Sequence, residues 1–407
     1  MAYQESRIGQ IRVAEQGEWG TAATSFSLPI EAEVGAYPAL NTEAVFTDAL
    51  RAHHYHPDVI SGAKSATLSL TMPLHGWSSA TPSGAATAGD RSADQILVQH
   101  AFGSMSYSGH TSDAAWLTGG TTGSVEYGAG QTPAGVDIGE AILVPVTGGT
   151  NSVGWVANRD VDGAGGSDSH TLLNTLSAVP ASSGIVYGGM VAALTRGTSS
   201  TPLTIQVKYA NSNSCLRIYD AVISSMSIDI NPKEQPKLTV EIQAANWIND
   251  ATGGAPGNYD YASYEQLPVS IGANGARLLL GTTSANVSSF NFALTNEVVE
   301  AKSHSGDQGL AQFVIVNRSA TCTYTQPSES ITARQPGHNQ LIQVDMGTGS
   351  PGNCVSLILA NGVLTGQAQI GDDGGLVAET FEYAGGLVTG DSSNTAPGNT
   401  SARLAFL

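Results

Sequence analysis

Charged side chains are scarce in this sequence: Asp, Glu, Lys and Arg make up 12% of its 407 residues, about half the share usual for a globular protein. Cations are scarcer still, since 16 Lys and Arg stand against 34 Asp and Glu and leave a formal net charge of −18. A groove that grips nucleic acid neutralises phosphates with many cations, so a conventional nucleic-acid binder is excluded. The acidic balance either keeps the protein soluble or gives a surface along which a polyanion can move without adhering.

Cysteines and long apolar runs are also nearly absent. The three cysteines, Cys215, Cys322 and Cys354, are odd in number and far apart, so neither a disulfide framework nor a metal site built from them is predicted. No run approaches the length of about 18 apolar residues that a membrane-spanning helix needs, and no membrane partner is expected. The polar residues 1–5 lack the apolar region of a signal peptide. We therefore expect synthesis in a reducing cytoplasm.

Motifs of catalysis and cofactor binding are missing as well. Neither a phosphate-binding loop with its lysine nor the G-x-S-x-G turn of hydrolases occurs. The G-x-G-x-x-G match at 347–352 precedes a strand-like run instead of the helix that a dinucleotide site requires, so a loop is favoured. The cluster of His53, His54, His56 and Asp58 could ligate a metal, but a loop at a subunit contact is the favoured interpretation. No catalytic residue, cofactor or metal is predicted.

Small residues take the place of the missing charges. The chain has 48 Gly, and its hydrophobic residues reach 41%, enough for substantial cores. Short alternating segments joined by small-residue turns are typical of β-sheet proteins, so we predict a mainly β fold. In 64–73, Leu and Met alternate with Ser and Thr, which predicts a half-buried strand. Residues 92–102 are the best helix candidate, with Ser92 as the cap and Gly103 as the terminator.

The clearest local signal is a pair of alternating runs at 226–230 and 238–242. The loop between them, 231–236, contains two prolines, and the pattern predicts a β-hairpin. A second hairpin is predicted at 367–383, with its turn at the Gly-rich stretch 371–375.

Four pairs of short segments recur in the same order in the two halves of the chain. They are 25–28 with 289–292, 64–73 with 318–327, 94–97 with 339–342, and 215–218 with 354–357. Such recurrence predicts two copies of one β-rich unit. The first copy spans 1–250 and carries a Gly-, Ser- and Thr-rich insertion at about 104–200. The second spans 265–407, after a linker-like stretch at 250–258.

Several of these segments resemble the siphophage major tail tube protein family, in its duplicated-domain type. The resemblance is carried by Ile11-Arg12-Val13 with 19–24, by the strand at 64–73 and the helix after it, by 216–242, and by 370–383. It touches most of the chain except 104–200. It implies two tandem tail-tube-type β-sandwich or barrel domains, each with a short flanking helix, in a structural protein that is not an enzyme.

The resemblance also implies partners and a location. Subunits of this family pair their sheet edges into rings, and the rings stack into a long non-contractile tail tube through which genomic DNA passes without specific binding during ejection. Duplicated members form homotrimers that imitate a six-domain ring, whereas single-domain members form hexamers, and the repeat favours the trimer. Expected partners are further copies of the chain and the tape measure, terminator and distal tail proteins. The protein would be made in the host bacterial cytoplasm and reside in the virion tail.

Polar positions of the two hairpins are the predicted lumen-facing residues: Ser227, Asp229, Thr239, Glu241, Glu379 and Glu382. The alternative for each is an ordinary solvent-exposed strand position. The alternative function is a capsid decoration protein or another β-rich virion protein. A β-rich glycan hydrolase is less favoured, because such enzymes place paired carboxylates in an aromatic-lined cleft and aromatics reach only 6% here. The missing signal peptide disfavours a secreted adhesin.

Overall fold

Strands dominate the computed structural model of the chain, which confirms the predicted mainly β fold. Within the described part there are 23 strands and one helix. The predicted contact loop at 53–58 and the linker at 251–258 lie outside that part. The described residues are 8–26, 29–30, 32–33, 37–46, 59–77, 91–109, 116–133, 136–149, 151–160, 168–195, 201–209, 215–231, 234–250, 269, 277–302, 310–327, 335–386 and 400–407.

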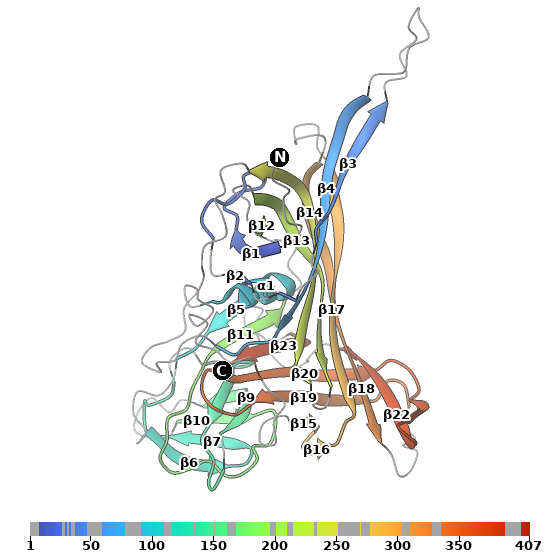
Figure 1. Cartoon of the computed structure of the whole chain (residues 1–407). Helices are drawn as coiled ribbons and strands as arrows, with labels where there is room; N and C mark the ends of the chain where they lie inside the picture. Colours follow the sequence, from blue (N-terminus) through green and yellow to red (C-terminus); the bar gives the residue numbers. More distant parts are fainter. Residues whose placement is uncertain are drawn as a thin grey trace, which may run out of the picture.

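Eight antiparallel strands form what we name the long sheet, which runs along one side of the molecule (Figure 1). The first predicted hairpin is confirmed, since its strands end at Ile230 and begin again at Lys237. In spatial order the strands are β3 (Ala39–Phe46), β4 (Val59–Pro73), β14 (Lys237–Asp250), β13 (Cys215–Ile230), β17 (Ser289–Lys302), β18 (Leu310–Pro327), β22 (Leu376–Gly385) and β21 (Gln369–Asp373).

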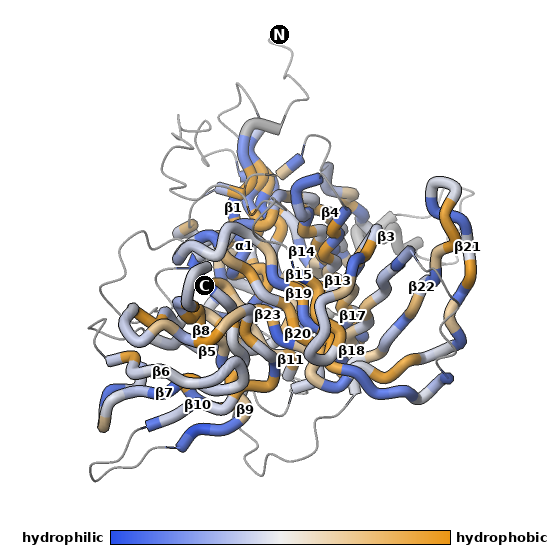
Figure 2. The backbone as a smooth tube through the Cα atoms, turned by 90° about the horizontal axis from the view of Figure 1, so that it is seen from below, coloured by the Kyte–Doolittle hydropathy of each residue, from blue (hydrophilic) through white to orange (hydrophobic). Residues whose placement is uncertain are grey.

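A second layer, the outer sheet, packs on the hydrophobic face of the long sheet. Side chains of both layers share one core cluster, in which Ile205 and Leu357 of the outer sheet lie with Leu70 and Ile228 of the long sheet. Figure 2 shows hydrophobic segments gathered where β13, β14, β19 and β20 converge. The outer strands are β2 (Pro29–Ile30), β1 (Ile8–Glu15), β12 (Leu203–Tyr209), β16 (Thr283–Ala285), β15 (Arg277–Leu280), β19 (Asn339–Gly347), β20 (Cys354–Leu364), β23 (Ala402–Phe406), β11 (Met190–Leu194) and β5 (Gly103–Tyr107).

The same series of antiparallel pairings occurs twice along the chain. The first series runs β2–β1–β12–β13–β14–β4–β3. The second runs β16–β15–β19–β20–β22–β18–β17. In the second series the counterpart of β13 is divided into two strands, β20 and β21, which both pair with β22. The two series meet where β13 pairs with β17.

Two of the four matched segment pairs lie at equivalent places in these series. Segments 64–73 and 318–327 end β4 and β18, and both strands stop at a proline. Segments 215–218 and 354–357 begin β13 and β20. Strand equivalence at these places therefore agrees with the sequence match.

The other two matches are wrong, because they join unlike elements. Residues 25–26 are not in a strand, whereas 289–292 begin β17. Residues 94–97 lie in the helix, whereas 339–342 begin β19. The family resemblance also implied a second flanking helix, and none occurs in the described part of the chain. Low-complexity sequence allows such short matches to arise without a common structure.

Helix α1 (Ala93–Phe102) is buried between the layers and confirms the helix predicted at 92–102. The backbone N–H of Ser92 donates to the side-chain oxygen of Gln95 at 3.0 Å, as in a capping box. Gly103 ends the helix with a φ of 97°, a left-handed conformation that favours glycine. The sequence signals for start and stop were therefore sufficient here.

The second predicted hairpin is present, but its turn is tighter than the five residues expected. Asp373 of β21 pairs with Leu376 of β22, which leaves Gly374 and Gly375 as the turn. Both have positive φ, 62° and 90°, as a two-residue turn matched to strand twist requires. Figure 2 shows this hairpin standing away from the body of the molecule.

A separate five-stranded sheet forms within the predicted insertion, at the lower left of Figure 1. It encloses its own core, which includes Val125, Tyr127 and Ile142. Although β5 and β11 lie within 104–200, they belong to the outer sheet. The five-stranded sheet, which we name the inserted sheet, therefore occupies a shorter stretch of sequence than the insertion predicted at about 104–200. Its strands are β6 (Leu117–Thr121), β7 (Ser124–Tyr127), β10 (Asp168–Leu172), β9 (Ser152–Asp160) and β8 (Ala141–Val144).

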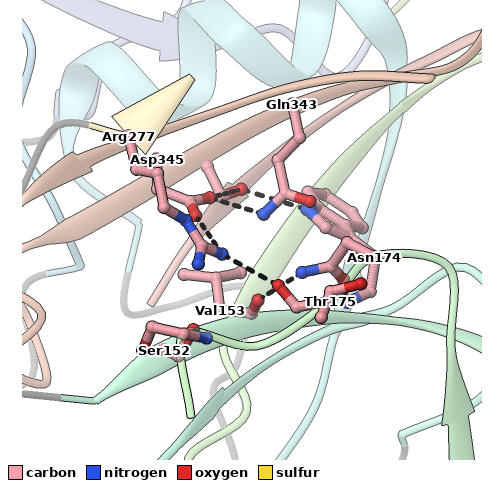
Figure 3. Close-up of polar contacts among 10 residues, drawn as sticks. Ser152, Val153, Asn174, Thr175, Arg277, Gln343 and Asp345 are labelled. Atoms are coloured by element: carbon pink, nitrogen blue, oxygen red, sulfur yellow. Dashed lines mark hydrogen bonds and ion pairs between the residues drawn. The ribbon is translucent and has the colours of Figure 1, made fainter. Parts of the chain in front are cut away.

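Buried polar contacts attach the inserted sheet to the outer sheet (Figure 3). Asp345 of β19 accepts a hydrogen bond from Ser356 Oγ at 2.7 Å and forms an ion pair with Arg277 at 3.5 Å. Arg277 also donates to the carbonyl oxygen of Thr175 at 3.3 Å, and Trp155 of β9 donates to Ser356 Oγ at 3.0 Å. Burial raises the pKa of Asp345, and Arg277 and the hydrogen bonds oppose that rise. Arg277 and the hydrogen-bond donors therefore offset part of the free-energy cost of burying the Asp345 carboxylate.

We predict that Asp345→Ala lowers the free energy of unfolding by about 3 kcal/mol, because buried donors and Arg277 lose their acceptor. Chemical denaturation with limited proteolysis measures this, and the inserted sheet should become cleavable first. Asp345→Asn, which keeps one acceptor oxygen, should cost less. Wild-type stability and cleavage in Asp345→Ala would show that these contacts do not hold the inserted sheet in place.

Candidate functional surface: the polar face of the long sheet

The long sheet has two chemically different faces, because successive side chains of a strand point to opposite sides. On β13, Met226 and Ile228 are buried in the core, while Ser227 and Asp229 are half-buried on the other side. In Figure 1, α1 and the outer sheet lie on one side of the long strands. The opposite side carries the polar residues, and we name it the polar face.

Strand register extends the polar face across the long sheet in rows. One row joins Thr71, Thr239, Ser227, Ala293 and Thr321 through direct cross-strand pairs. Neighbouring rows are similar in character, with short hydroxyl and amide side chains and few long ones. The polar members are Ser69, Thr71, Ser225, Ser227, Asp229, Thr239, Glu241, Asn291, Thr295, Thr321, Thr323, Thr325, Thr380 and Glu382.

Hydrogen bonds between neighbouring strands hold these short side chains in place. The hydroxyls of Thr71 and Thr239 lie 3.2 Å apart, and those of Thr325 and Thr380 lie 2.9 Å apart. Cross-strand hydroxyl pairs of this kind stabilise a sheet modestly. They also use part of each group's hydrogen-bonding capacity within the protein, which leaves less for a ligand.

Two carboxylates on the polar face also accept hydrogen bonds from side chains of neighbouring strands. Asn291 Nδ2 donates to Asp229 at 2.6 Å, and Ser69 Oγ donates to Glu241 at 3.0 Å. The cation at the end of one row, Lys237, forms an ion pair with Glu33 at 2.6 Å. Since Asp229, Glu241 and Glu382 outnumber this paired cation, the described part of the polar face offers no cluster of cations that could retain phosphate groups.

Five of the six predicted lumen-facing residues lie together on the polar face: Ser227, Asp229, Thr239, Glu241 and Glu382. The prediction for Glu379 is wrong. Its side chain is fully buried, and it points to the same side as Phe381 and Tyr383, which belong to the core. Glu379 and Glu382 are three positions apart in one strand, and an odd separation places them on opposite faces.

Residues from β17 and β18 were missed by the sequence reasoning, although they complete the face. Thr321, Thr323 and Thr325 alternate with Cys322 and Tyr324, which are buried. This alternation was visible in the sequence. The predicted lumen-facing residues all lie in the two hairpins and therefore do not include these threonines.

The described residues contain neither a metal-binding group nor a membrane-spanning helix. No group of three or more His, Cys, Asp or Glu side chains that could hold a metal ion occurs in the part of the chain that the structure describes. The described helix α1 lacks the length and apolar character needed to cross a bilayer.

The described strands define a β-sheet protein with one broad polar face and an edge strand at each end of the long sheet. The profile of the phage tail tube protein family matches residues 6–385. The chain therefore belongs to the phage tail tube protein family, a family of structural virion components. No individually curated protein matches it in sequence.

We predict that the two faces respond oppositely to the same new charge. Ile228→Asp should prevent folding, because it places an unpaired carboxylate in the core. Ser227→Asp, one position away, should leave the thermal midpoint within a few degrees of wild type. Circular dichroism and soluble yield measure both, and a soluble, stable Ile228→Asp variant would contradict the assignment of faces.

Proposed function

We propose that the chain is the major tail tube subunit of a long non-contractile phage tail of the siphophage type. Subunits polymerise into stacked rings, and the rings form the conduit for DNA ejection. The observation that supports this most is the polar face, a hydroxyl-rich and cation-poor surface on the side of the long sheet opposite the outer sheet. A polyanion moves past such a surface without being retained, because retention requires phosphate neutralisation.

The open edges of the long sheet support self-assembly. Among the described strands, β3 at one end pairs with β4 alone, and β21 at the other end pairs with β22 alone. Unpaired edges recruit further strands, and closing a sheet into a barrel removes them. A head-to-tail edge contact closes into a ring when the rotation permits. The polar face would then line the lumen, with Ser227, Asp229, Thr239, Glu241 and Glu382 among its residues.

A duplicated architecture supports a ring of three chains. We assign one tail-tube-type unit to 1–250, with the insertion, and the other to 265–407, because the same series of pairings occurs in both. Three such chains would supply six units, as in a hexamer of single-unit subunits, which is the alternative. The proposed partners are other copies of the chain and the tape measure, terminator and distal tail proteins. The chain would be made in the host bacterial cytoplasm and reside in the virion tail.

A capsid decoration protein is the second candidate function. The inserted sheet supports it, because it has its own core and lies to one side of the long sheet. A decoration protein binds a capsid surface and needs neither a ring nor a tube, so the state of assembly separates the two candidates.

Electron microscopy of the purified protein at rising concentration tests the proposal. We expect rings and hollow tubes with threefold symmetry at low resolution. Sixfold symmetry with six chains per ring would support the hexamer. If the protein stays as single compact particles at every concentration, and also when tail initiation proteins are added, the tail tube proposal is overturned.

DNA release from intact phage tests the lining. Changing Glu241 and Glu382 to Lys should leave tube assembly intact and slow ejection several-fold at low salt, because a cationic lumen attracts phosphate. The effect should shrink as salt screens the charges. The matched control places the same charge changes at Glu18 and Glu126, which are exposed outside the long sheet. Equal ejection rates in both double variants would argue against this lining.

A further inference from the structure

Both open edges of the long sheet expose apolar side chains. On β3, Leu40 is 42% exposed, and Tyr37 just before it is 53% exposed; on β21, Ile370 is 57% exposed. Large apolar side chains at an unpaired strand edge favour association with another strand. The two edges are far apart in sequence, and each has a counterpart inside the chain.

Strand β3 corresponds to β17 in sequence and in register. The sequence Ala-Leu-Asn-Thr-Glu-Ala-Val at 39–45 matches Ala-Leu-Thr-Asn-Glu-Val-Val at 293–299. Ala39 pairs with Thr67 and Ala293 pairs with Thr321, which are equivalent positions of the matched strands β4 and β18. Register irregularities also fall at equivalent places, between residues 42 and 44 and between residues 297 and 298.

Strand β21 corresponds to the end of β13 by the same reasoning. Thr-Val-Glu-Ile at 239–242 of β14 matches Thr-Phe-Glu-Tyr at 380–383 of β22. Thr239 pairs with Ser227 of β13, and Thr380 pairs with Gln369 of β21. Gln369 is therefore the counterpart of Ser227, and Ile370 is the counterpart of Ile228.

The counterparts of the two open edges are paired with each other inside the chain. At this internal junction Ser227 of β13 pairs with Ala293 of β17. Ile228 of β13 and Leu294 of β17 are both fully buried there. The side chains that correspond to them, Ile370 and Leu40, are exposed at the open edges. Their exposure is the property expected of a junction whose other half is on a second chain.

We propose that β21 of one subunit pairs antiparallel with β3 of a second copy of the chain, in the register of the internal junction. Gln369 then lies opposite Ala39 of the neighbour. Ile370 and Leu40 become buried as Ile228 and Leu294 are, and the polar face continues without a break. The proposal rests on the tail tube function and specifies which edges meet and how they are aligned.

Engineered cysteines test the register. The native thiols do not compete, since Cys215, Cys322 and Cys354 are all buried. In assembled rings or tubes, the double variant Ala39→Cys with Gln369→Cys should cross-link between chains on mild oxidation, because directly opposite Cβ atoms are close enough for a disulfide. Each single variant should give no such product.

Two further variants calibrate the measurement. Ser227→Cys with Ala293→Cys places the same geometry at the internal junction and should cross-link within one chain. Asn41→Cys with Gln369→Cys shifts the register by two residues. It should yield at least about tenfold less product, because diagonal neighbours are too far apart for a disulfide.

Edge substitutions give an independent readout of the same proposal. Ile370→Lys should leave the monomer folded and abolish rings, because the charge would be buried at the junction. Leu376→Lys is the matched control: Leu376 is 60% exposed in the same hairpin but lies outside the proposed pairing. Its rings should form as in wild type.

The outcomes separate the proposal from the function on which it rests. Rings or tubes in which the shifted pair cross-links as well as the aligned pair, or in which neither does, overturn the register while the tail tube function stands. Wild-type protein that forms no rings or tubes under any condition overturns the function and the edge pairing together. Cross-linking of the aligned pair alone, with loss of rings in Ile370→Lys only, establishes the proposal.

Discussion

A strand without a neighbour leaves a row of backbone N–H and C=O groups unpaired, and this constraint governs how the chain is arranged. Within the outer sheet, β20 pairs with the C-terminal strand β23, β23 pairs with β11, and β11 pairs with β5. Strands from distant parts of the sequence thus pair the backbone N–H and C=O groups along one another's edges. In the long sheet the internal junction does the same. At the two ends of the long sheet, β3 and β21 each pair with one strand among the described residues, and the proposed assembly supplies the second partner.

The internal junction is reinforced from behind by the helix. Asn296 of β17 is buried and donates to the carbonyl oxygens of Ala101 in α1, at 3.1 Å, and of Ile223 in β13, at 2.8 Å. Phe102 stacks on Phe292 with ring centroids 6.1 Å apart. A helix end buried in a protein must find partners for its carbonyls, and here β17 supplies one. Helix, β13 and β17 therefore stabilise each other, which makes the junction part of the fold of a single chain.

The bend of β13 shows how one strand serves both layers. Asp220 has a φ of 55°, the only positive value at a non-glycine among the described residues, and it lies where the register with β12 shifts, between the pairs Ile205–Ile218 and Leu203–Ala221. Its carboxylate accepts hydrogen bonds from Gln16, at 2.9 Å, from the backbone of Gly20, at 2.7 Å, and from Asn246, at 2.8 Å. A bulge turns a strand and needs such support. The long sheet and the outer sheet thereby share one continuous backbone.

By itself the sequence determined the mainly β fold, the helix with both its ends, the hairpin at Ile230 and Lys237, and most of the polar face, because period-two alternation and capping residues act locally. Family membership was likewise visible in its strand patterns. Only the tertiary structure decided that Glu379 is buried, since an acidic residue on the core side of a strand looks like its neighbours in sequence. It also decided which repeat matches were false, and it revealed that 39–45 corresponds to 293–299. Two strands are equivalent when they pair with equivalent partner strands, and these partners are far away in the sequence. A short segment of low-complexity sequence does not determine which distant strand it will pair with.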